Sequence, residues 1–569
     1  MRTIFKIVIA LMLVPGMYVK AQTLDEGVKA MENENYRTAR DIFQKVSNAD
    51  PANAKALFYL GEALFQTGDV AAAQAAYDKC VIAQPTEYNG YIGQAKCMLD
   101  NGNVKDAEKK IAMVMSASKG KDQTILCYIA DAYAFNKNHD WAKGIEYAQK
   151  AIGTAKGKDD YQCYNTLGDI YYEKHYSGNG DDKDAGFAVS SFEKSYQLNP
   201  KSAYAITKVG KIWSTTRNDQ SYKLAEDALN KAKAADPDFI PMHGVWAYLY
   251  QISGQFEKAK AEQEIYMAGC EDKIKPNDRM INILYKLKDW NGAYNLALKM
   301  NSNNPGNCDY IRVLAHTSTE LGKGADAVNY FDQYQKKCDV AKMDIEDYIY
   351  MAKANKVAGN DSMSNVYFYK VIGIDSTREQ SILKEMARGY YASRKYAAAA
   401  EVYKKLCEKY PTPDALFRLA DSYYSMKKYK ECGVVADTFI AQNPTLPLGY
   451  LFKARSLYYT DTLNERKASA DAYKLFLEKA ADTAVRKTVL TSEIIEAHKQ
   501  LIQYQIKKNN LKGALEQCDL ALKDDPNNES IQNLKTRIEK AIANRNTPAP
   551  APKPGPKPAP KPAPKPKGK

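Results

Sequence analysis

Apolar side chains recur at helical spacing along most of this chain, in short segments that come in pairs. The clearest pair lies in residues 54–85, where the turn Thr67-Gly68-Asp69 separates two segments of about equal length. Their large apolar side chains include Leu57, Leu60, Leu64 and Tyr77. Neither helix can bury its apolar stripe alone, so each must pack on its partner and on a further copy of the same hairpin.

Small residues mark the copies of this hairpin. Ala39, Ala73 and Ala107 are 34 residues apart, and Pro51 and Pro85 have the same spacing. Such a position must be small because the two helices of one hairpin touch there. Fourteen positions of this kind predict fourteen hairpins: Ala39, Ala73, Ala107, Gly144, Ala188, Ala225, Ala259, Ala293, Ala327, Ser364, Ala399, Cys432, Ser469 and Ala514. Residues 527–545 are then one more amphipathic helix, whose polar outer face would cap the open end of the array.

The order of residues within a hairpin resembles the tetratricopeptide repeat (TPR). The hairpin of residues 54–85 has Leu60, Gly61, Ala73, Tyr77 and Pro85, and residues 164–172, YNTLGDIYY, repeat its first half. The resemblance covers most of residues 24–526. It implies an all-α, right-handed solenoid over residues 22–526, in which the first helices of the hairpins line a concave groove for protein partners.

Two features interrupt the regular spacing. Gly144 and Ala188 are 44 residues apart, and the extra residues lie in the predicted turn 177–186, SGNGDDKDAG. The turn is acidic, but its residues do not follow the order of an EF-hand calcium loop, so we interpret it as a solvated loop. With further long loops at residues 116–124 and 153–160, we expect the array to bend or split near residues 115–190.

Residues 1–21 have the pattern of a secretory signal peptide. Arg2 and Lys6 precede an eight-residue apolar run that is too short to span a membrane. Small or β-branched residues near the end of the segment predict cleavage between Ala21 and Gln22, and the alternative is a buried first helix. No other apolar run is long enough for a transmembrane segment. We therefore expect an exported protein of the periplasm or outer-membrane periphery of a Gram-negative bacterium.

A Pro- and Lys-rich tail, residues 546–569, supplies much of the net charge of +13. Without the tail and the signal peptide the charges are nearly balanced, and no basic stripe indicates nucleic-acid binding. The composition predicts an extended polyproline II arm. Its evenly spaced lysines suit contact with anionic envelope polymer or lipid head groups, and the alternative is an inert solvated tail.

Ten cysteines in an exported chain raise the question of disulfides. Cys308 begins the first helix of its predicted hairpin and Cys338 ends the second, so antiparallel helices would bring the two together. We predict that this pair can form a disulfide. Most of the others, such as Cys80, Cys432 and Cys518, occupy positions where the repeat needs a small apolar residue, which favours buried free thiols.

The sequence lacks the motifs of the common enzyme classes. HExxH, GxSxG, the phosphate loop GxxxxGK[ST] and a GxGxxG after a strand are all absent. The five histidines are far apart in the sequence, and no CxxC pair suggests a zinc site. The repeats leave no segment long enough for a catalytic domain. We therefore expect no enzymatic activity, no cofactor and no metal.

Recognition then depends on groove-facing side chains of the first helices. Tyrosine offers a rigid apolar ring with a hydroxyl, and arginine adds bidentate hydrogen bonds, so both are typical of binding hot spots. For any single tyrosine, core packing is the alternative, because the chain has 42 of them. The candidate partner-binding residues are Lys384, Arg388, Tyr391, Asp421, Tyr424, Arg455 and Tyr458, with Tyr172 and Tyr248 on similar faces upstream.

We interpret the chain as a protein-interaction scaffold of the bacterial cell envelope that binds partner segments in its groove. One alternative is a cell-wall or outer-membrane tether that acts through the Pro/Lys-rich tail, with the array as a spacer. A second alternative is a carbohydrate-binding surface receptor, since some outer-membrane glycan binders contain TPRs. The regularity of the array argues against the second alternative.

Overall fold

The computed structural model describes residues 23–154, 160–216 and 218–546. Among these residues the chain has thirty α-helices, two short 3-10 helices and no strand. Nearly all the α-helices follow one another as packed pairs, which confirms the predicted all-α array. The predicted signal peptide, with its cleavage site at Ala21 and Gln22, and the tail after Asn546 lie outside the described residues.

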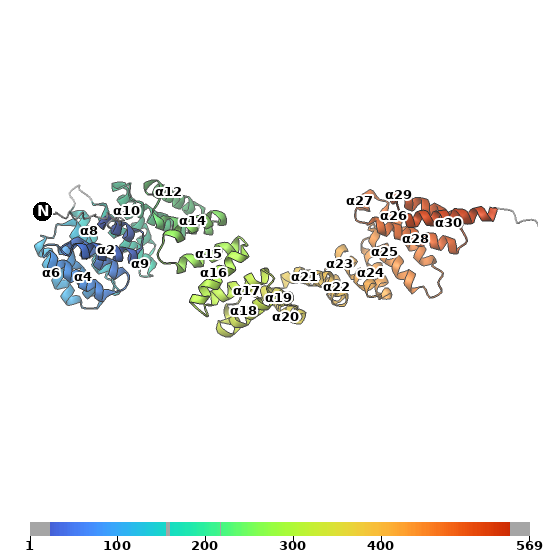
Figure 1. The fold of residues 1–569 in the computed structure, drawn as a ribbon, viewed down its shortest axis with the longest axis horizontal. Coiled ribbons are helices and arrows are strands. Elements are labelled where there is room, and N and C mark those ends of the chain that lie inside the picture. The colour runs from blue at the N-terminus through green and yellow to red at the C-terminus, as the bar shows by residue number, and fades with distance from the viewer. Residues whose placement is uncertain (1–22, 155–159, 217, 547–569) are drawn as a thin grey trace, which may run out of the picture. The chain divides into compact units, whose positions relative to one another are not determined.

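The chain divides into two compact units, of which unit 1 ends at Lys342 (Figure 1). Unit 1 contains nine helix pairs, α1 to α18, and a short 3-10 helix after them. Its elements are α1 Leu24–Glu32, α2 Tyr36–Ala49, α3 Ala54–Gln66, α4 Val70–Ala83, α5 Tyr88–Asp100, α6 Val104–Ala117, α7 Gln123–Ala134, α8 Trp141–Gly153, α9 Tyr161–Tyr176, α10 Asp182–Leu198, α11 Ala203–Thr215, α12 Asp219–Ala235, α13 Ile240–Ile252, α14 Phe256–Gly269, α15 Ile274–Lys286, α16 Trp290–Asn303, α17 Cys308–Glu320, α18 Gly324–Lys337 and η1 Val340–Lys342.

Unit 2 begins at Met343 and contains five further helix pairs. A short helix, α27, separates the last two pairs, and α30 ends the unit. Its elements are α19 Ile345–Val357, α20 Asp361–Ile374, η2 Ser376–Arg378, α21 Glu379–Ala392, α22 Tyr396–Lys409, α23 Pro413–Ser425, α24 Tyr429–Gln442, α25 Pro447–Thr460, α26 Lys467–Ala480, α27 Thr483–Arg486, α28 Thr491–Lys507, α29 Leu511–Asp524 and α30 Glu529–Asn546.

The small positions predicted from the sequence hold each pair together. All fourteen lie on the second helix of a pair, and all are buried. In the pair α3–α4, Ala73 is fully buried, and a Cβ atom on Gly61 would lie only 2.3 Å from the ring of Tyr77. Glycine at this position therefore lets an aromatic ring lie directly against the facing helix.

The first helices of neighbouring pairs contact each other, for example α5 with α7 and α23 with α25. The second helices pack instead within their own pair and on the first helix of the next pair, as α24 does on α25. We therefore call the side formed by the first helices the inner face of each unit, and the side formed by the second helices the outer face.

The last helix covers the end of the core of unit 2. Ile531 and Ile538 of α30 are buried against Ile495, Ile502 and Cys518 of the preceding pair. This arrangement agrees with the capping helix expected over residues 527–545, because the opposite side of α30 carries exposed polar residues.

The turn between α1 and α2 contacts the seventh helix pair of unit 1. The side-chain amide of Asn35 donates to the backbone oxygen of Gly269 at 2.9 Å, across 234 residues of sequence. The backbone N–H of Ile240 donates to the side-chain oxygen of Asn33 at 3.0 Å. The helices from α1 to α14 therefore curve far enough for their two ends to meet.

Glu271, just after α14, caps the start of α2. Its carboxylate accepts hydrogen bonds from the backbone N–H groups of Arg37 at 2.9 Å and Thr38 at 3.0 Å. Such an arrangement satisfies two of the free donors at a helix N-terminus and places a negative charge at the positive end of the helix. The contact between the ends of this segment is thus charge-assisted as well as polar.

The acidic turn before α10 differs from the prediction. We interpreted residues 177–186 as a solvated loop, but α10 already begins at Asp182. Asp181 caps this helix, and Asp184 is buried in a capping box and forms an ion pair with Lys174 at 3.0 Å. Two of the aspartates therefore stabilise the helix start, for which their acidic side chains are well suited.

The boundary between the two units does not lie in the region where the sequence pattern is interrupted. Residues 115–190, where we expected a bend or split, lie inside unit 1, and consecutive helices from α7 to α10 contact one another there. The boundary lies instead after Lys342, where spacing of the small residues remains close to regular.

Two disulfides are present in unit 1. Cys308 and Cys338, the predicted pair, are bonded with their Cα atoms 5.8 Å apart, and the sequence placed them correctly at the two ends of the pair α17–α18. A second disulfide, which the sequence did not predict, joins Cys127 of α7 to Cys163 of α9. The six remaining cysteines are free, and all except the half-buried Cys407 are buried.

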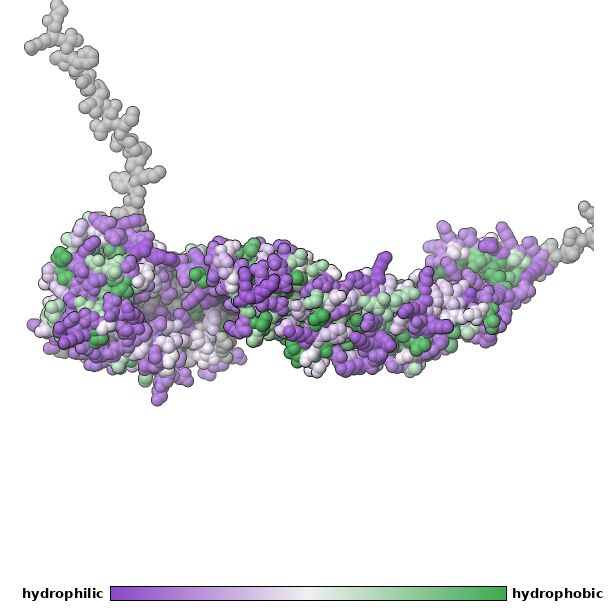
Figure 2. All heavy atoms as spheres, turned by 90° about the horizontal axis from the view of Figure 1, so that it is seen from below, coloured by the Kyte–Doolittle hydropathy of each residue, from purple (hydrophilic) through white to green (hydrophobic). Residues whose placement is uncertain are grey.

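No helix in the described ranges is both long and apolar enough to cross a lipid bilayer. Hydrophilic residues cover most of the face that Figure 2 shows, and hydrophobic residues form small separate areas. The most exposed large apolar side chains include Ile82 and Leu463.

Candidate functional site

Three first helices of unit 2 carry most of the predicted partner-binding residues. Tyr391 lies on α21 and Asp421 on α23, and the tyrosine hydroxyl donates a hydrogen bond to the carboxylate. The guanidinium of Arg418, also on α23, lies over the Tyr391 ring at 4.6 Å from its centroid. Burial and the Asp421 carboxylate raise the pKa of Tyr391 to about 12, so the hydroxyl stays protonated as a donor. Neighbouring helices thus share one polar and aromatic contact.

The next contact along the inner face of unit 2 is an ion pair between α25 and α28. Arg455 donates to both carboxylate oxygens of Glu496, at 2.9 and 2.6 Å, and its side chain is only 13% exposed. Tyr473 donates to the same carboxylate at 3.0 Å. Burial lowers the pKa of Arg455, but the contact with Glu496 outweighs it and the net shift is upward. Arg455 is therefore an internal anchor of the inner face, with its charge already paired.

Tyrosines form a cluster beside this ion pair. Arg455 lies over the ring of Tyr424, 5.2 Å from its centroid, and Tyr424 contacts Tyr459. The rings of Tyr429 and Tyr459 stack at 4.2 Å with an interplanar angle of 11°. Tyr459 is 52% exposed, so one side of the stack faces solvent. The cluster has the composition of a binding hot spot, with flat rings next to arginine.

Three other predicted residues of unit 2 lie at the edges of this region. Arg388 is exposed and forms an ion pair with Asp414 at 3.2 Å. Lys384 is half-buried and makes no ion pair with any residue that the structure describes. Tyr458 contacts Tyr459, with their ring centroids 5.2 Å apart. The inner face from Arg388 to Tyr458 is therefore continuous along the three helices.

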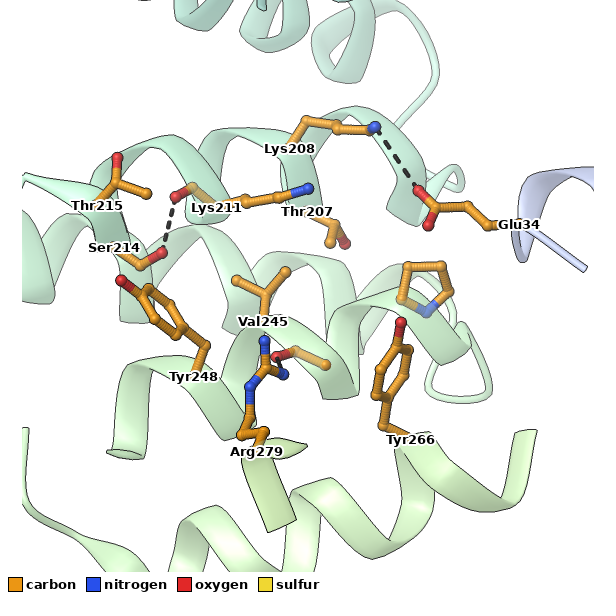
Figure 3. A pocket seen from close by; sticks show the side chains of 12 residues that line it. Glu34, Thr207, Lys208, Lys211, Ser214, Thr215, Val245, Tyr248, Tyr266 and Arg279 are labelled. Atoms are coloured by element: carbon orange, nitrogen blue, oxygen red, sulfur yellow. Dashed lines mark hydrogen bonds and ion pairs between the residues drawn. The ribbon is translucent and has the colours of Figure 1, made fainter. Parts of the chain in front are cut away.

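The two predicted residues in unit 1 have different surroundings. Tyr172 is buried, and its ring lies beneath the ammonium groups of Lys208 and Lys211, at 5.3 and 5.2 Å from its centroid. Tyr248 lines a cavity of about 270 Å³, which Figure 3 shows from close by. Only Tyr248 of these two has a side chain that reaches an open space.

Polar side chains on the inner face of unit 1 pair with one another. Lys96 of α5 is almost fully buried, and its ammonium donates to Glu62 of α3 at 2.9 Å and to Asp131 of α7 at 2.5 Å. Further along, Tyr204 donates to both oxygens of Asp169, at 2.8 and 2.9 Å. Burial raises the pKa of Asp131 and that of Asp169, the latter to about 6.

Sequence reasoning missed several residues that complete these contacts. Glu496 was missed because the connection containing α27 breaks the regular spacing before α28. Arg418 lies one helical turn from the predicted Asp421, and a search for arginine next to each groove position could have found it. Glu62 and Lys96 are 34 residues apart, so opposite charges at the same position of successive repeats were a usable signal.

Comparison with known proteins supports this description of the fold. The sequence model of the tetratricopeptide repeat matches residues 24–88 and 384–431, one segment in each unit. No curated protein matches the chain significantly.

Solved structures that are similar to parts of this chain include the following two. The C-terminal part of a TPR repeat-containing protein from Cytophaga hutchinsonii is 20% identical over 45% of this chain and 98% of its own, with a TM-score of 0.36. PilW, a type IV pilus biogenesis factor, is 18% identical over 37% of this chain and 93% of its own, with a TM-score of 0.29.

The helix pairs and the matched segments together define a helical repeat protein in which the first helices form an inner face of each unit. The chain contains tetratricopeptide repeats, which the sequence model detects in both units. This fold supports protein–protein interaction, and it does not by itself name a partner.

Proposed function

We propose that this chain is a non-enzymatic protein-interaction scaffold of the bacterial cell envelope, and that partner segments bind along the inner face of α21, α23 and α25 in unit 2. The observation that best supports this proposal is the row of tyrosine and arginine side chains from Tyr391 to Tyr459. Contacts with neighbouring side chains hold these residues in place, and part of their ring surface is exposed. Residues held in one geometry before binding lose less conformational entropy when a partner arrives.

Unit 2 suits this role better than unit 1. The inner face of unit 1 holds paired charges such as Lys96 with Glu62 and Asp131, and its first turn contacts the seventh helix pair. A segment that entered there would have to displace hydrogen bonds already made inside the protein, each of which is costly to leave unmade. The inner face of unit 2 keeps exposed groups, among them Arg388 and Tyr459.

The envelope location rests on the predicted signal peptide and is supported by the two disulfides of unit 1. Disulfides persist in oxidising compartments such as the periplasm. The Pro/Lys-rich tail fits the same setting, because a cationic extended arm can contact anionic polymer or lipid head groups. We propose that the tail adds weak contact with the envelope while the inner face of unit 2 selects the protein partner.

Affinity purification of the full chain from crosslinked cells tests the scaffold. We expect Tyr459→Ala and Arg418→Ala each to reduce the amount of co-purified partner at least tenfold, because they remove an exposed ring and a half-buried guanidinium from the proposed hot spot. The matched controls are Tyr369→Ala, a 40% exposed tyrosine on the outer helix α20, and Arg537→Ala on α30. Partner recovery that is unchanged in both test variants would contradict the proposal.

Truncation after Asn546 separates the scaffold from the tether that acts through the tail. We expect the truncated chain to keep its protein partners and to sediment less with purified cell wall at low salt, since contacts between exposed charges are screened by ions. Loss of all protein partners on truncation would favour the tether instead.

A further inference from the structure

The cavity in unit 1 lies between the turn before α2 and helices of the sixth, seventh and eighth pairs (Figure 3). Its residues come from five places: the turn before α2, and helices α11, α13, α14 and α15. Its volume is about 270 Å³. Pockets for drug-sized molecules are roughly 300–1,000 Å³, so this cavity suits a smaller molecule.

Positive charge predominates among the lining residues. Lys208, Lys211 and Arg279 are cationic, and Glu34 is the one acidic residue among the described residues that line the cavity. Lys208 lies 3.8 Å from Glu34, so this pair is partly compensated. Figure 3 shows the two lysines on one side of the cavity and Arg279 on the other.

Arg279 is held in place by neutral groups. Its guanidinium donates to the backbone oxygen of Gly244 at 2.7 Å and to the side chain of Gln263 at 3.3 Å. No carboxylate of the described chain lies within 4 Å of Arg279 or of Lys211. Burial lowers the pKa of Arg279. A desolvated cation without an anionic partner is unfavourable, so the site gains stability when an anion enters.

The hydroxyl of Thr207 is a second, independent indication that the cavity binds a polar ligand. This hydroxyl is buried, and none of the described residues supplies a hydrogen-bond partner for it. The rings of Tyr248 and Tyr266, with Val245 between α11 and α15, give the same cavity an aromatic and apolar wall. Such a wall favours a ligand with a flat or apolar body in addition to its charged group.

From these features we propose that the cavity binds a small organic oxyanion, a ring-sized molecule that carries a carboxylate or a phosphate monoester. Arg279 and Lys211 would contact the anionic group, and the two tyrosine rings would contact the body. The site goes beyond the scaffold function, since it uses different residues in a different unit.

Calorimetric titration of the full chain tests the site. The probes are phenyl phosphate and benzoate, with benzyl alcohol as the neutral analogue and inorganic phosphate as the anion without a ring. We expect at least one of the two organic anions to bind and benzyl alcohol not to bind. If phenyl phosphate binds more tightly than benzoate, inorganic phosphate should bind at least fivefold more weakly than phenyl phosphate. The stronger of the two organic anions identifies the preferred class.

Matched variants locate the binding. Arg279→Gln and Lys211→Gln should each weaken the preferred probe at least tenfold, whereas Lys223→Gln, an exposed lysine on α12 outside the cavity, should change its affinity less than twofold. Lys211 is exposed and has no carboxylate partner in the described chain, so its variant keeps the test valid if Arg279→Gln fails to fold.

Thr207→Val separates a ligand contact from a structural role. The variant keeps the shape of the side chain and removes the unpaired hydroxyl, so the free protein should melt at the same or a higher temperature. Affinity for the preferred probe should fall at least threefold at the same time. Absence of binding by both organic anions up to 10 mM, equal binding of benzyl alcohol, or unchanged affinity in Arg279→Gln and Lys211→Gln would each overturn the proposal.

Discussion

The buried ammonium of Lys96 gives the sharpest test of how unit 1 is held together. It lies 2.9 Å from Glu62 and 2.5 Å from Asp131, and the three residues belong to α3, α5 and α7, the first helices of consecutive pairs. Burial lowers the pKa of Lys96, the two carboxylates raise it more, and the net shift is upward. Lys96→Met removes the charge and keeps a side chain of similar length.

The expected loss in the free energy of unfolding comes from the carboxylates of Glu62 and Asp131, which no longer face a positive charge. Removing one partner of a buried ion pair costs about 3–5 kcal/mol, because the remaining charge is uncompensated. At about 2 °C per kcal/mol for a unit of this size, the melting temperature of unit 1 should fall by roughly 6–10 °C. Hydrogen exchange should accelerate first in α3, α5 and α7, which share the ion pairs.

The loss should also depend on pH. Burial already raises the pKa of Asp131 above its ordinary value of 3.8, and without Lys96 the repulsion from Glu62 raises it further. When the pKa of a carboxyl is higher in the folded than in the unfolded protein, the free energy of unfolding falls as pH rises from the unfolded pKa to the folded pKa. It recovers on acidification. The deficit of Lys96→Met should therefore shrink between pH 7.5 and pH 5.

Urea denaturation of Lys96→Met, with hydrogen exchange read by mass spectrometry, measures both effects. Lys105→Met, an exposed lysine on the next helix α6, is the matched control and should be neutral. Adding Asp131→Asn to Lys96→Met should recover part of the loss, because one of the two facing charges is gone. A melting temperature within 1 °C of the unmodified chain, or a deficit that does not change with pH, would show that Lys96 does not hold these helices together.

Three further predictions concern other parts of the fold. Ala73→Glu should destabilise unit 1 by at least about 2 kcal/mol, because it places a larger, charged side chain at a fully buried helix contact. A thermal melt followed by circular dichroism measures this loss, and an unchanged melt would show that the repeat register is wrong. Glu271→Gln should cost about 1 kcal/mol and speed the amide exchange of Arg37 and Thr38, which its carboxylate now caps; protection equal to that of the unmodified chain would argue against the capping contact. Asp169, whose pKa burial raises from 3.8 to about 6, should make the unmodified chain lose stability as pH rises from about 4 to about 6. In urea titrations Asp169→Asn should flatten this slope, and an unaltered slope would assign it to other groups.

The sequence predicted the fold because its decisive signals are local. A buried small residue such as Ala73 is required where the two helices of a hairpin touch, and each of the fourteen hairpins has one. Since each pair packs mainly on its neighbours, the number of pairs and the terminal cap followed from counting.

Contacts that depend on the curvature of the array could not be read in the same way. Asn35 and Gly269 meet across 234 residues, and small rotations accumulated over many repeats decide whether such segments touch. The candidate site shows the same limit. Tyr391 and Arg455 were placed on the inner face from the repeat pattern, whereas Glu496, which pairs with Arg455, follows an irregular connection and was missed.

Site-specific photocrosslinking in living cells tests the central claim most directly. A benzophenone amino acid would replace Tyr458 on the inner face of unit 2 and, in a second strain, Val434, which is 67% exposed on the outer helix α24. We expect covalent adducts with defined partner peptides from position 458 and no such adducts from position 434. Adducts from position 434 alone, or equal yields from both positions, would contradict this claim.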